Sequence, residues 1–380
     1  MKSKYLLGVV VLAFIVLGLI SSLRYTGLSV AEDSIKIGAV LILSGQIAEI
    51  GTAMQKGILI AQDEINSNGG FNGKPLKVIF EDDALLIKGP IGAVTSSQKL
   101  ISSDKIVASL VTAVNDAKPI APLFEESKIP LVTLWDSNKE LESLGDYIFG
   151  IGFSTEKSGE NMAEFAFNDL NINEIATAFI QDEWSQLIHK SFVEKFTEFG
   201  GKVNELGSYS TDETDFKTLI TKLEYGNSKA IYFPFVTNPA SVNFLKQAKE
   251  FGWDGIVLTG DLVTPELIDL AQDTIEGVYY TQVFAEENDR LTGLKEAYLK
   301  KFGKEPQLIV FTAWGYDGLN IIFEAIKIAD SIEPIKINEA VYKIRGLEGA
   351  TGIITFNEKG SAPKEERIWK VENRKEVLIK

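Results

Sequence analysis

The chain has 380 residues, a formal net charge of −15, no cysteine and a single histidine. The absence of cysteine excludes a small secreted scaffold that is held together by disulfides. The acidic charge disfavours nucleic acid as a partner, because nucleic-acid-binding domains present basic surfaces to phosphates. The length exceeds the usual size of one hydrophobic core, so we expect two lobes.

Residues 1–33 form an export segment. Lys2 and Lys4 precede an uncharged run of apolar and small residues from Tyr5 to Leu23. This run nearly reaches the about 20 residues that span a bilayer, which favours an uncleaved membrane anchor. The small residues Ser29-Val30-Ala31 equally fit the cleavage site of a signal peptide. Both outcomes stay open, and either one places the rest of the chain outside the cytoplasm.

The stretch from residue 35 to residue 66 predicts a strand, a turn and a helix. Ile35 to Leu43 is an apolar run that suits a strand covered on both faces, and Ser44-Gly45 ends it. The helix is indicated by apolar residues at spacings of four, three and four, namely Met54, Ile58, Ala61 and Ile65. Ligands bind at the carboxyl ends of strands in open α/β sheets, so residues 44–51 form either a ligand loop or an ordinary connection.

Strands and helices alternate along most of the remaining chain. Up to residue 150 we expect strands at 75–80, 106–110, 129–134 and 147–149, with helices between them. A similar series begins again at residue 158. Its second helix, expected at 187–199, is followed by the glycine pair Gly200-Gly201, which repeats the earlier Gly69-Gly70. The tail differs, because 351–356 and 367–371 read as antiparallel strands joined by a turn at 357–360. Two α/β lobes with mainly parallel sheets are therefore predicted.

Catalytic and metal-binding patterns are missing from the sequence. No GxSxG, HExxH or GxxxxGK[ST] motif occurs. His189 lies inside a predicted helix, without a cysteine or a second histidine nearby. We therefore expect neither a cofactor, nor a metal, nor enzymatic activity.

The order of elements resembles that of the type I periplasmic substrate-binding proteins of ABC importers, and most closely the leucine/isoleucine/valine-binding branch. The resemblance covers essentially the whole exported chain and includes the segments IKIGAVLILSGQIAEIGTAMQKGILIAQDEIN, GGFNGKPLKVIFEDDA and TGIITFNEKG. It implies two Rossmann-like lobes joined by a three-crossing hinge, which close around a small ligand and dock on an ABC permease. The expected lobes are 34–152 with 284–352, and 153–283 with 353–380, in a monomer.

The resemblance also implies a set of ligand-contacting positions in both lobes. In this sequence they are Ile50, Asn115, Asp116, Trp135, Asp136, Ser137, Trp184, Thr237 and Asp261. Trp184 stands where the family has an aromatic lid, and Asp261 stands where an acid grips the ligand ammonium. Asp116 and Asp136 depart from the family, because relatives have small or hydroxyl residues there for the ligand carboxylate. An aspartate before a helix is also a common helix cap, and this alternative stays open for both.

These positions predict an extracytoplasmic protein that captures a small polar ligand, such as an amino acid or an amide-like compound. The acids favour a ligand with net positive charge, because a ligand carboxylate near Asp116 would meet like-charge repulsion. Backbone N–H groups at a helix N-terminus could still hold such a carboxylate. The alternatives are a ligand-sensing ectodomain that signals through a membrane partner and, with less support, an exported hydrolase.

Overall fold

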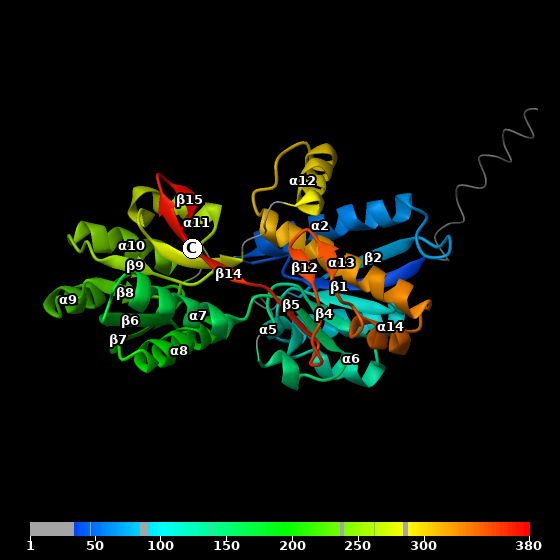
Figure 1. The fold of residues 1–380 in the computed structure, drawn as a ribbon, viewed down its shortest axis with the longest axis horizontal. Helices are drawn as coiled ribbons and strands as arrows, with labels where there is room; N and C mark the ends of the chain where they lie inside the picture. Colours follow the sequence, from blue (N-terminus) through cyan, green and yellow to red (C-terminus); the bar gives the residue numbers. More distant parts are fainter. Residues whose placement is uncertain are drawn as a thin grey trace, which may run out of the picture.

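The computed structural model describes residues 34–45, 47–83, 90–137, 139–235, 239–261, 263–283 and 288–380. Two α/β lobes lie side by side along the long axis of the molecule (Figure 1). The predicted fold class, with mainly parallel sheets in two lobes, is confirmed. The described part of the chain contains no helix that is long and apolar enough to cross a membrane. The proposed anchor and signal peptide fall on residues 1–33, which lie outside the described residues.

Lobe 1 is built on a parallel sheet with the strand order β13-β5-β4-β3-β1-β2. Its strands are β1 (Ile35–Leu41), β2 (Leu76–Asp82), β3 (Ala108–Val111), β4 (Leu131–Thr133), β5 (Ile148–Gly152) and β13 (Ser361–Pro363). Six of the seven residues of β1 are buried, as expected for a strand that is covered on both faces.

Helices cover both faces of the lobe 1 sheet. One face carries α2 (Ala48–Ser67), α12 (Asp289–Phe302), α13 (Ile309–Ala329) and α14 (Pro334–Val341). The other carries α4 (Pro90–Lys99), η1 (Leu100–Asp104), α5 (Val114–Ala117), α6 (Ala121–Ser127) and η2 (Leu141–Ser143). Helices α2 and α13 cross closely, because a Cβ on Gly57 would lie 1.9 Å from the Thr312 carbonyl oxygen. Each sheet face thus has its own apolar core.

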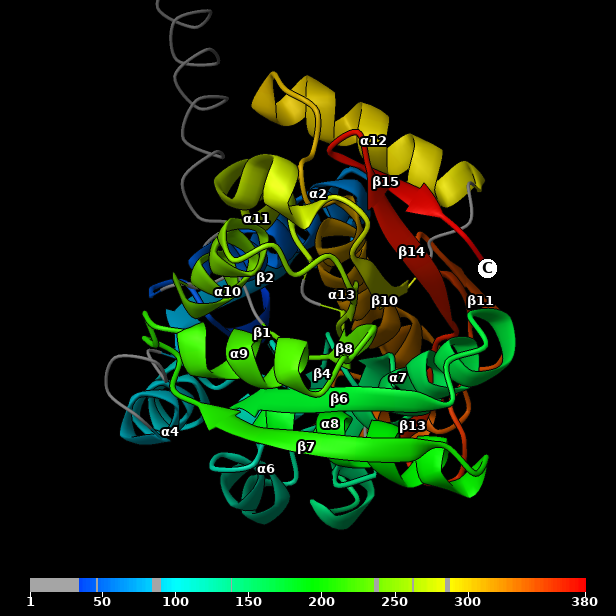
Figure 2. The same ribbon diagram turned by 90° about the vertical axis from the view of Figure 1, so that its left-hand side faces the viewer.

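Lobe 2 has a sheet with the strand order β15-β14-β10-β9-β8-β6-β7. The strands β6 (Glu174–Ile180), β7 (Lys202–Tyr209), β8 (Ala230–Tyr232), β9 (Ile256–Leu258) and β10 (Tyr279–Val283) are parallel, whereas β14 (Glu366–Glu372) and β15 (Lys375–Leu378) are antiparallel. Figure 2 looks onto this lobe, with β6 and β7 in front. It is therefore a parallel α/β sheet extended by an antiparallel tail.

Helices cover the lobe 2 sheet on both sides as well. One side carries α7 (Thr155–Glu164), η3 (Phe165–Asp169) and α8 (Glu183–Glu198). The other carries α9 (Lys217–Tyr225), α10 (Pro239–Glu250), α11 (Pro265–Ala271) and η4 (Gln272–Ile275). The two lobes therefore share one layered design, as the repeated pattern of the sequence predicts.

Three crossings join the described elements of the two lobes: β5 to α7, β10 to α12, and β13 to β14. The last one corrects the expected boundary at residue 353, because β13 pairs with β5 in the sheet of lobe 1. The tail strands therefore do not form one antiparallel unit. The hairpin of β11 (Leu347–Gly349) and β12 (Gly352–Ile354) stays on lobe 1, where the buried Asp317 accepts the N–H groups of Ala350 and Thr351.

Candidate ligand-binding site

The loops at the carboxyl ends of the strands meet between the lobes. The Trp135 indole N–H of lobe 1 donates to Asp261 Oδ2 of lobe 2, with 3.3 Å between the heavy atoms. Trp184 of lobe 2 packs against the core cluster of lobe 1. The molecule is therefore in a closed arrangement, with the predicted ligand residues at the contact between the lobes.

Trp135 follows β4 and is firmly held by lobe 1. Its side chain packs edge-on against Phe311, with 5.2 Å between ring centroids, and the residue is 7 % exposed. Gly152 lies behind it in a left-handed conformation, with φ of 116°, and a Cβ there would be 2.0 Å from the Trp135 carbonyl oxygen. The crossing from β5 to α7 therefore requires a glycine at position 152. The close contact of this glycine with the Trp135 carbonyl holds Trp135 in place at the contact between the lobes.

Asp261 lies in the turn after β9 and is 5 % exposed. Burial raises the pKa of its carboxyl to about 7, and Asp136 acts in the same direction, whereas the indoles of Trp135 and Trp184 lower it. Its Oδ1 has no hydrogen-bond partner among the residues that the structure describes. A buried carboxyl oxygen without a donor is costly, so this atom is a natural contact for a ligand donor.

Trp184 stands in the first turn of α8. The helix begins at Asp182, whose carboxyl accepts the Ser185 N–H at 2.7 Å. The indole ring lies against Gly260, since a Cβ there would be 2.8 Å from the ring. Its buried N–H meets no acceptor at hydrogen-bond geometry within the described residues. The ring therefore lies next to the turn that carries Asp261 and packs against lobe 1.

Asp116 and Asp136 both cap the short helix α5. The Ala113 N–H donates to Asp116 Oδ2 at 3.1 Å, and the Val114 N–H donates to Asp136 Oδ1 at 2.7 Å. Two N–H groups at the start of α5 are therefore taken by carboxyls of the protein itself. The capping role, which the sequence posed as an alternative to a ligand contact, is observed for both residues.

The two carboxyls also stand in an acidic environment. Burial, Asp83 and Asp136 raise the pKa of Asp116 well above its usual range. Burial raises the pKa of Asp136 to about 7, and Glu156 adds to this, while Lys118 opposes it. Asp83 directly follows β2 and is fully buried. Its position at the carboxyl edge of the sheet was the sequence signal that could have identified Asp83 as a neighbour of Asp116.

The other predicted site residues occupy varied environments. Ile50 is 1 % exposed and packs in the core of lobe 1, and Asn115 is half-buried in α5. The Ser137 hydroxyl donates to the Gly152 carbonyl oxygen at 3.4 Å, so it is engaged with the first crossing. Thr237 lies outside the described residues.

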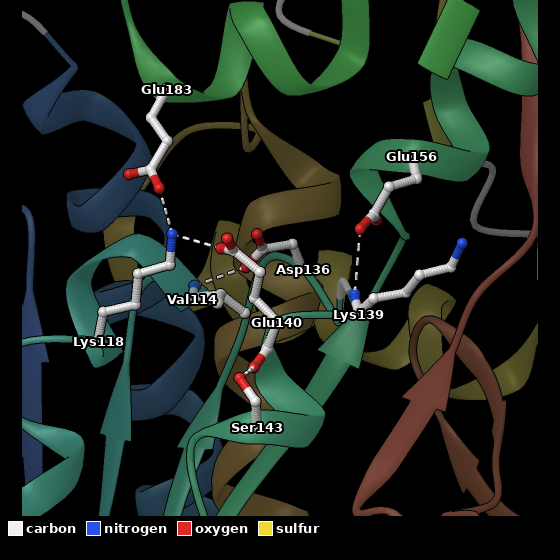
Figure 3. A network of polar contacts seen from close by, with 8 residues as sticks. All are labelled: Val114, Lys118, Asp136, Lys139, Glu140, Ser143, Glu156 and Glu183. Carbon is white, nitrogen blue, oxygen red and sulfur yellow. Dashed lines mark hydrogen bonds and ion pairs between the residues drawn. The ribbon is translucent and has the colours of Figure 1, made fainter. Parts of the chain in front are cut away.

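An ion-pair network that the sequence did not reveal joins the lobes beside the cleft. The Lys118 ammonium contacts Glu140 of its own lobe and Glu183 in the first turn of α8 (Figure 3). The same view shows Glu156, near the start of α7, accepting the Lys139 N–H at 3.3 Å. Lys118 and Glu183 are 65 positions apart and belong to different lobes, so only the closed arrangement brings these two side chains together.

A second contact between the lobes is a pair of carboxyls. Glu49, in the first turn of α2, hydrogen-bonds with Glu266, in the first turn of α11. Burial raises the pKa of Glu49 to about 7, and the charge and hydrogen bond of Glu266 contribute. Two carboxyls can share a hydrogen bond only when one of them is protonated, so this contact depends on pH.

Comparison with known proteins agrees with this architecture. Residues 34–375 match the sequence profile of the family described as periplasmic binding protein. The chain belongs to this family. A leucine-, isoleucine-, valine-, threonine- and alanine-binding protein from Pseudomonas aeruginosa is 27% identical over 340 residues, which are 88% of this chain and 89% of the relative. The type I periplasmic binding proteins of the leucine/isoleucine/valine-binding kind are thus confirmed as its relatives.

Solved structures of this family are also similar to the chain. A leucine binding protein from Thermotoga maritima has a TM-score of 0.82 and 28% identity, with 91% of this chain and 98% of that chain covered. A branched-chain amino acid substrate-binding protein from Streptococcus pneumoniae, in complex with isoleucine, has a TM-score of 0.81 at 24% identity, covering 91% and 99%. Periplasmic binding proteins are solute-binding proteins and not enzymes, and the family implies an extracytoplasmic location.

Proposed function

We propose that this periplasmic binding protein captures a small organic ligand with a cationic group between its lobes and delivers it to an ABC permease. The observation that carries the proposal is the capping of α5 by Asp116 and Asp136, at 3.1 and 2.7 Å. These carboxyls take two of the N–H groups at the start of α5 that a ligand carboxylate could otherwise accept from. The buried, unsatisfied Oδ1 of Asp261 supports the same conclusion from the other lobe, as judged over the described residues.

The charge of the site disfavours an aliphatic amino acid. Its carboxylate would have to displace Asp136 from the Val114 N–H and would then lie near Asp116 and Asp83. Like charges in a poorly hydrated cleft repel strongly, because the effective dielectric constant is low. The relatives named for leucine, isoleucine and valine nevertheless make such an amino acid the second candidate.

A binding screen on the purified full-length chain tests the proposal. Thermal-shift and calorimetric titrations would compare leucine and isoleucine with cationic compounds such as agmatine and putrescine. We expect the cations to raise the melting temperature, since a ligand of the folded state stabilises it, and the aliphatic amino acids to leave it unchanged. Micromolar binding of leucine that is insensitive to Asp116→Ser would contradict the proposal.

Delivery and export need separate experiments. Uptake of the identified ligand by vesicles that contain the partner permease should depend on this protein. If the ligand binds but no uptake follows, the sensing alternative gains support. Residues 1–33 would direct export, and N-terminal sequencing of the protein recovered from its host distinguishes a cleaved signal peptide from a retained anchor.

A further inference from the structure

Glu366 is a half-buried acid on lobe 2 whose two carboxyl oxygens are buried, and the family resemblance assigns it no role. It is the first residue of β14 and pairs with Val283, the last residue of β10. Since β14 is antiparallel to its neighbours, its first residue lies at the same edge of the sheet as the carboxyl ends of β8, β9 and β10. Asp261 follows β9 at this edge, and Tyr232 ends β8. The topology therefore gathers three polar side chains from separate segments.

The polar atoms of these residues are buried and unsatisfied. Both carboxyl oxygens of Glu366, the Tyr232 hydroxyl and Asp261 Oδ1 are without a hydrogen-bond partner in the described part of the chain. The Tyr232 ring is fixed by stacking on Phe192, with 3.8 Å between centroids. A group of unsatisfied polar atoms in one place is rare in folded proteins and points to a bound molecule.

The charges of these residues also lack compensation. Burial and Asp261 raise the pKa of Glu366 well above its usual range, and only Ser158 and Lys157 act in the opposite direction. The Lys157 ammonium pairs with Glu160 at 3.2 Å instead. Burial raises the pKa of Tyr232, and the charges of Asp261 and Glu366 add to this. Two buried carboxyls without a cation are stable only if they hold a proton or if a ligand brings the positive charge.

We propose that Glu366 is a second ligand-binding carboxyl, and that the cationic group of the ligand carries at least two N–H donors shared between Asp261 and Glu366. This inference rests on the function proposed above and extends it to the chemistry of the ligand. A primary ammonium and a guanidinium both meet the requirement, with three and five N–H donors. A quaternary ammonium carries the charge without the donors and would leave both carboxyls unsatisfied.

The test is calorimetric titration of the full-length protein with agmatine, putrescine, choline and leucine. It compares the wild type with the variants Glu366→Gln and Asp261→Asn. The control is Glu365→Gln, because Glu365 is the neighbouring residue and its side chain is 87% exposed. We expect agmatine or putrescine to bind the wild type and choline not to bind. Glu366→Gln should weaken the binding at least about tenfold, and the control should stay within about twofold.

Proton release provides an independent readout. Binding of a cation should displace protons that these carboxyls hold in the free protein, because burial raises the pKa of both. The binding enthalpy in two buffers of different ionisation enthalpy gives the number of protons released, which should fall in Glu366→Gln. If that variant does not fold, Glu366→Asp keeps the charge but shortens the side chain, and it should also weaken binding.

The outcomes separate this inference from the proposed function. One outcome is that Asp261→Asn loses cation binding while Glu366→Gln keeps the affinity and the proton release of the wild type. That outcome would overturn the role of Glu366 and leave the proposed function standing. Binding of choline as tight as that of agmatine would overturn the requirement for N–H donors. If no cation binds the wild type, both the inference and the proposed function are wrong.

Discussion

The carboxyls at the start of α5 combine two tasks that usually belong to different residues. Asp136 caps the helix by accepting the Val114 N–H, and it places a buried carboxyl, with its pKa raised to about 7 by burial, near the contact between the lobes. Removal of the carboxyl would release the backbone donor and would reduce the repulsion of a ligand carboxylate. Under the proposed function, we expect this side chain to influence the choice between a cationic and a zwitterionic ligand.

We predict that Asp136→Ser increases the affinity for leucine, because the Val114 N–H becomes available to the ligand carboxylate. The loss of the cap should cost about 1 kcal/mol of stability. Asn288→Ala is the matched control, since Asn288 caps α12 by accepting the Leu291 N–H at 2.9 Å. Calorimetric titration with leucine measures the effect. An unchanged affinity for leucine would show that the cap does not control the selectivity.

At the scale of elements, the first lobe depends on the close crossing of α2 and α13. Gly57 of α2 meets the Thr312 carbonyl, and Gly315 of α13 meets the Met54 carbonyl, where a Cβ would lie 1.9 and 2.0 Å from oxygen. These contacts are with backbone, so no side chain can move aside. The crossing sets the position of the α2 N-terminus, which carries Glu49 to the cleft.

Gly57→Ala should destabilise the protein by about 2 kcal/mol or more, since the two helices must separate. Gly293→Ala is the control, because Gly293 lies in α12 and has nothing within 4 Å of a built Cβ. That substitution should stabilise the protein by up to about 1 kcal/mol through helix propensity. Denaturant unfolding followed by circular dichroism measures both. Equal effects of the two variants would contradict the role of the crossing.

At the scale of the whole molecule, closure brings like charges together as well as opposite ones. Lys118 and Glu183 attract each other across the lobes, whereas the Glu49–Glu266 pair needs a proton. The pKa of Glu49 is raised in the closed state to about 7. The closed state therefore gains stability from this pair at low pH and loses it as the pH rises through about 7.

We predict that the ligand-free protein opens as the pH rises from 6 to 8, and that Glu49→Gln reduces this change. The glutamine amide can donate to Glu266 without a proton, so the contact survives at high pH. The radius of gyration from small-angle X-ray scattering measures the opening. Glu250→Gln is the control. Glu250 is an acid of lobe 2 that lies at the end of α10 and outside the cleft. An identical pH dependence in Glu49→Gln and the wild type would exclude the pair as a pH-sensitive contact.

The sequence by itself determined the type of fold, because hydrophobic periodicity and glycine stops are local properties of the chain. The strand from Ile35, the helix with Met54 and Ile58, and the repeat of this pattern in the second lobe were all predictable. So was the place of Trp184 and Asp261 in loops of lobe 2 that meet lobe 1, through the family order of elements. The tail strands were read correctly as strands but paired wrongly, since pairing depends on partners distant in the chain.

Only the tertiary structure decided what the acids do. The roles of Asp83, Asp116 and Glu366 depend on which buried groups surround them, and those groups come from separate strands and from both lobes. Burial makes each carboxyl costly to ionise, and neighbouring carboxyls add to this cost. Local sequence shows that an aspartate follows a strand, but it cannot show whether the charge meets water, a backbone N–H or another carboxyl. That difference, which exists only in the folded chain, is what favours a cationic ligand.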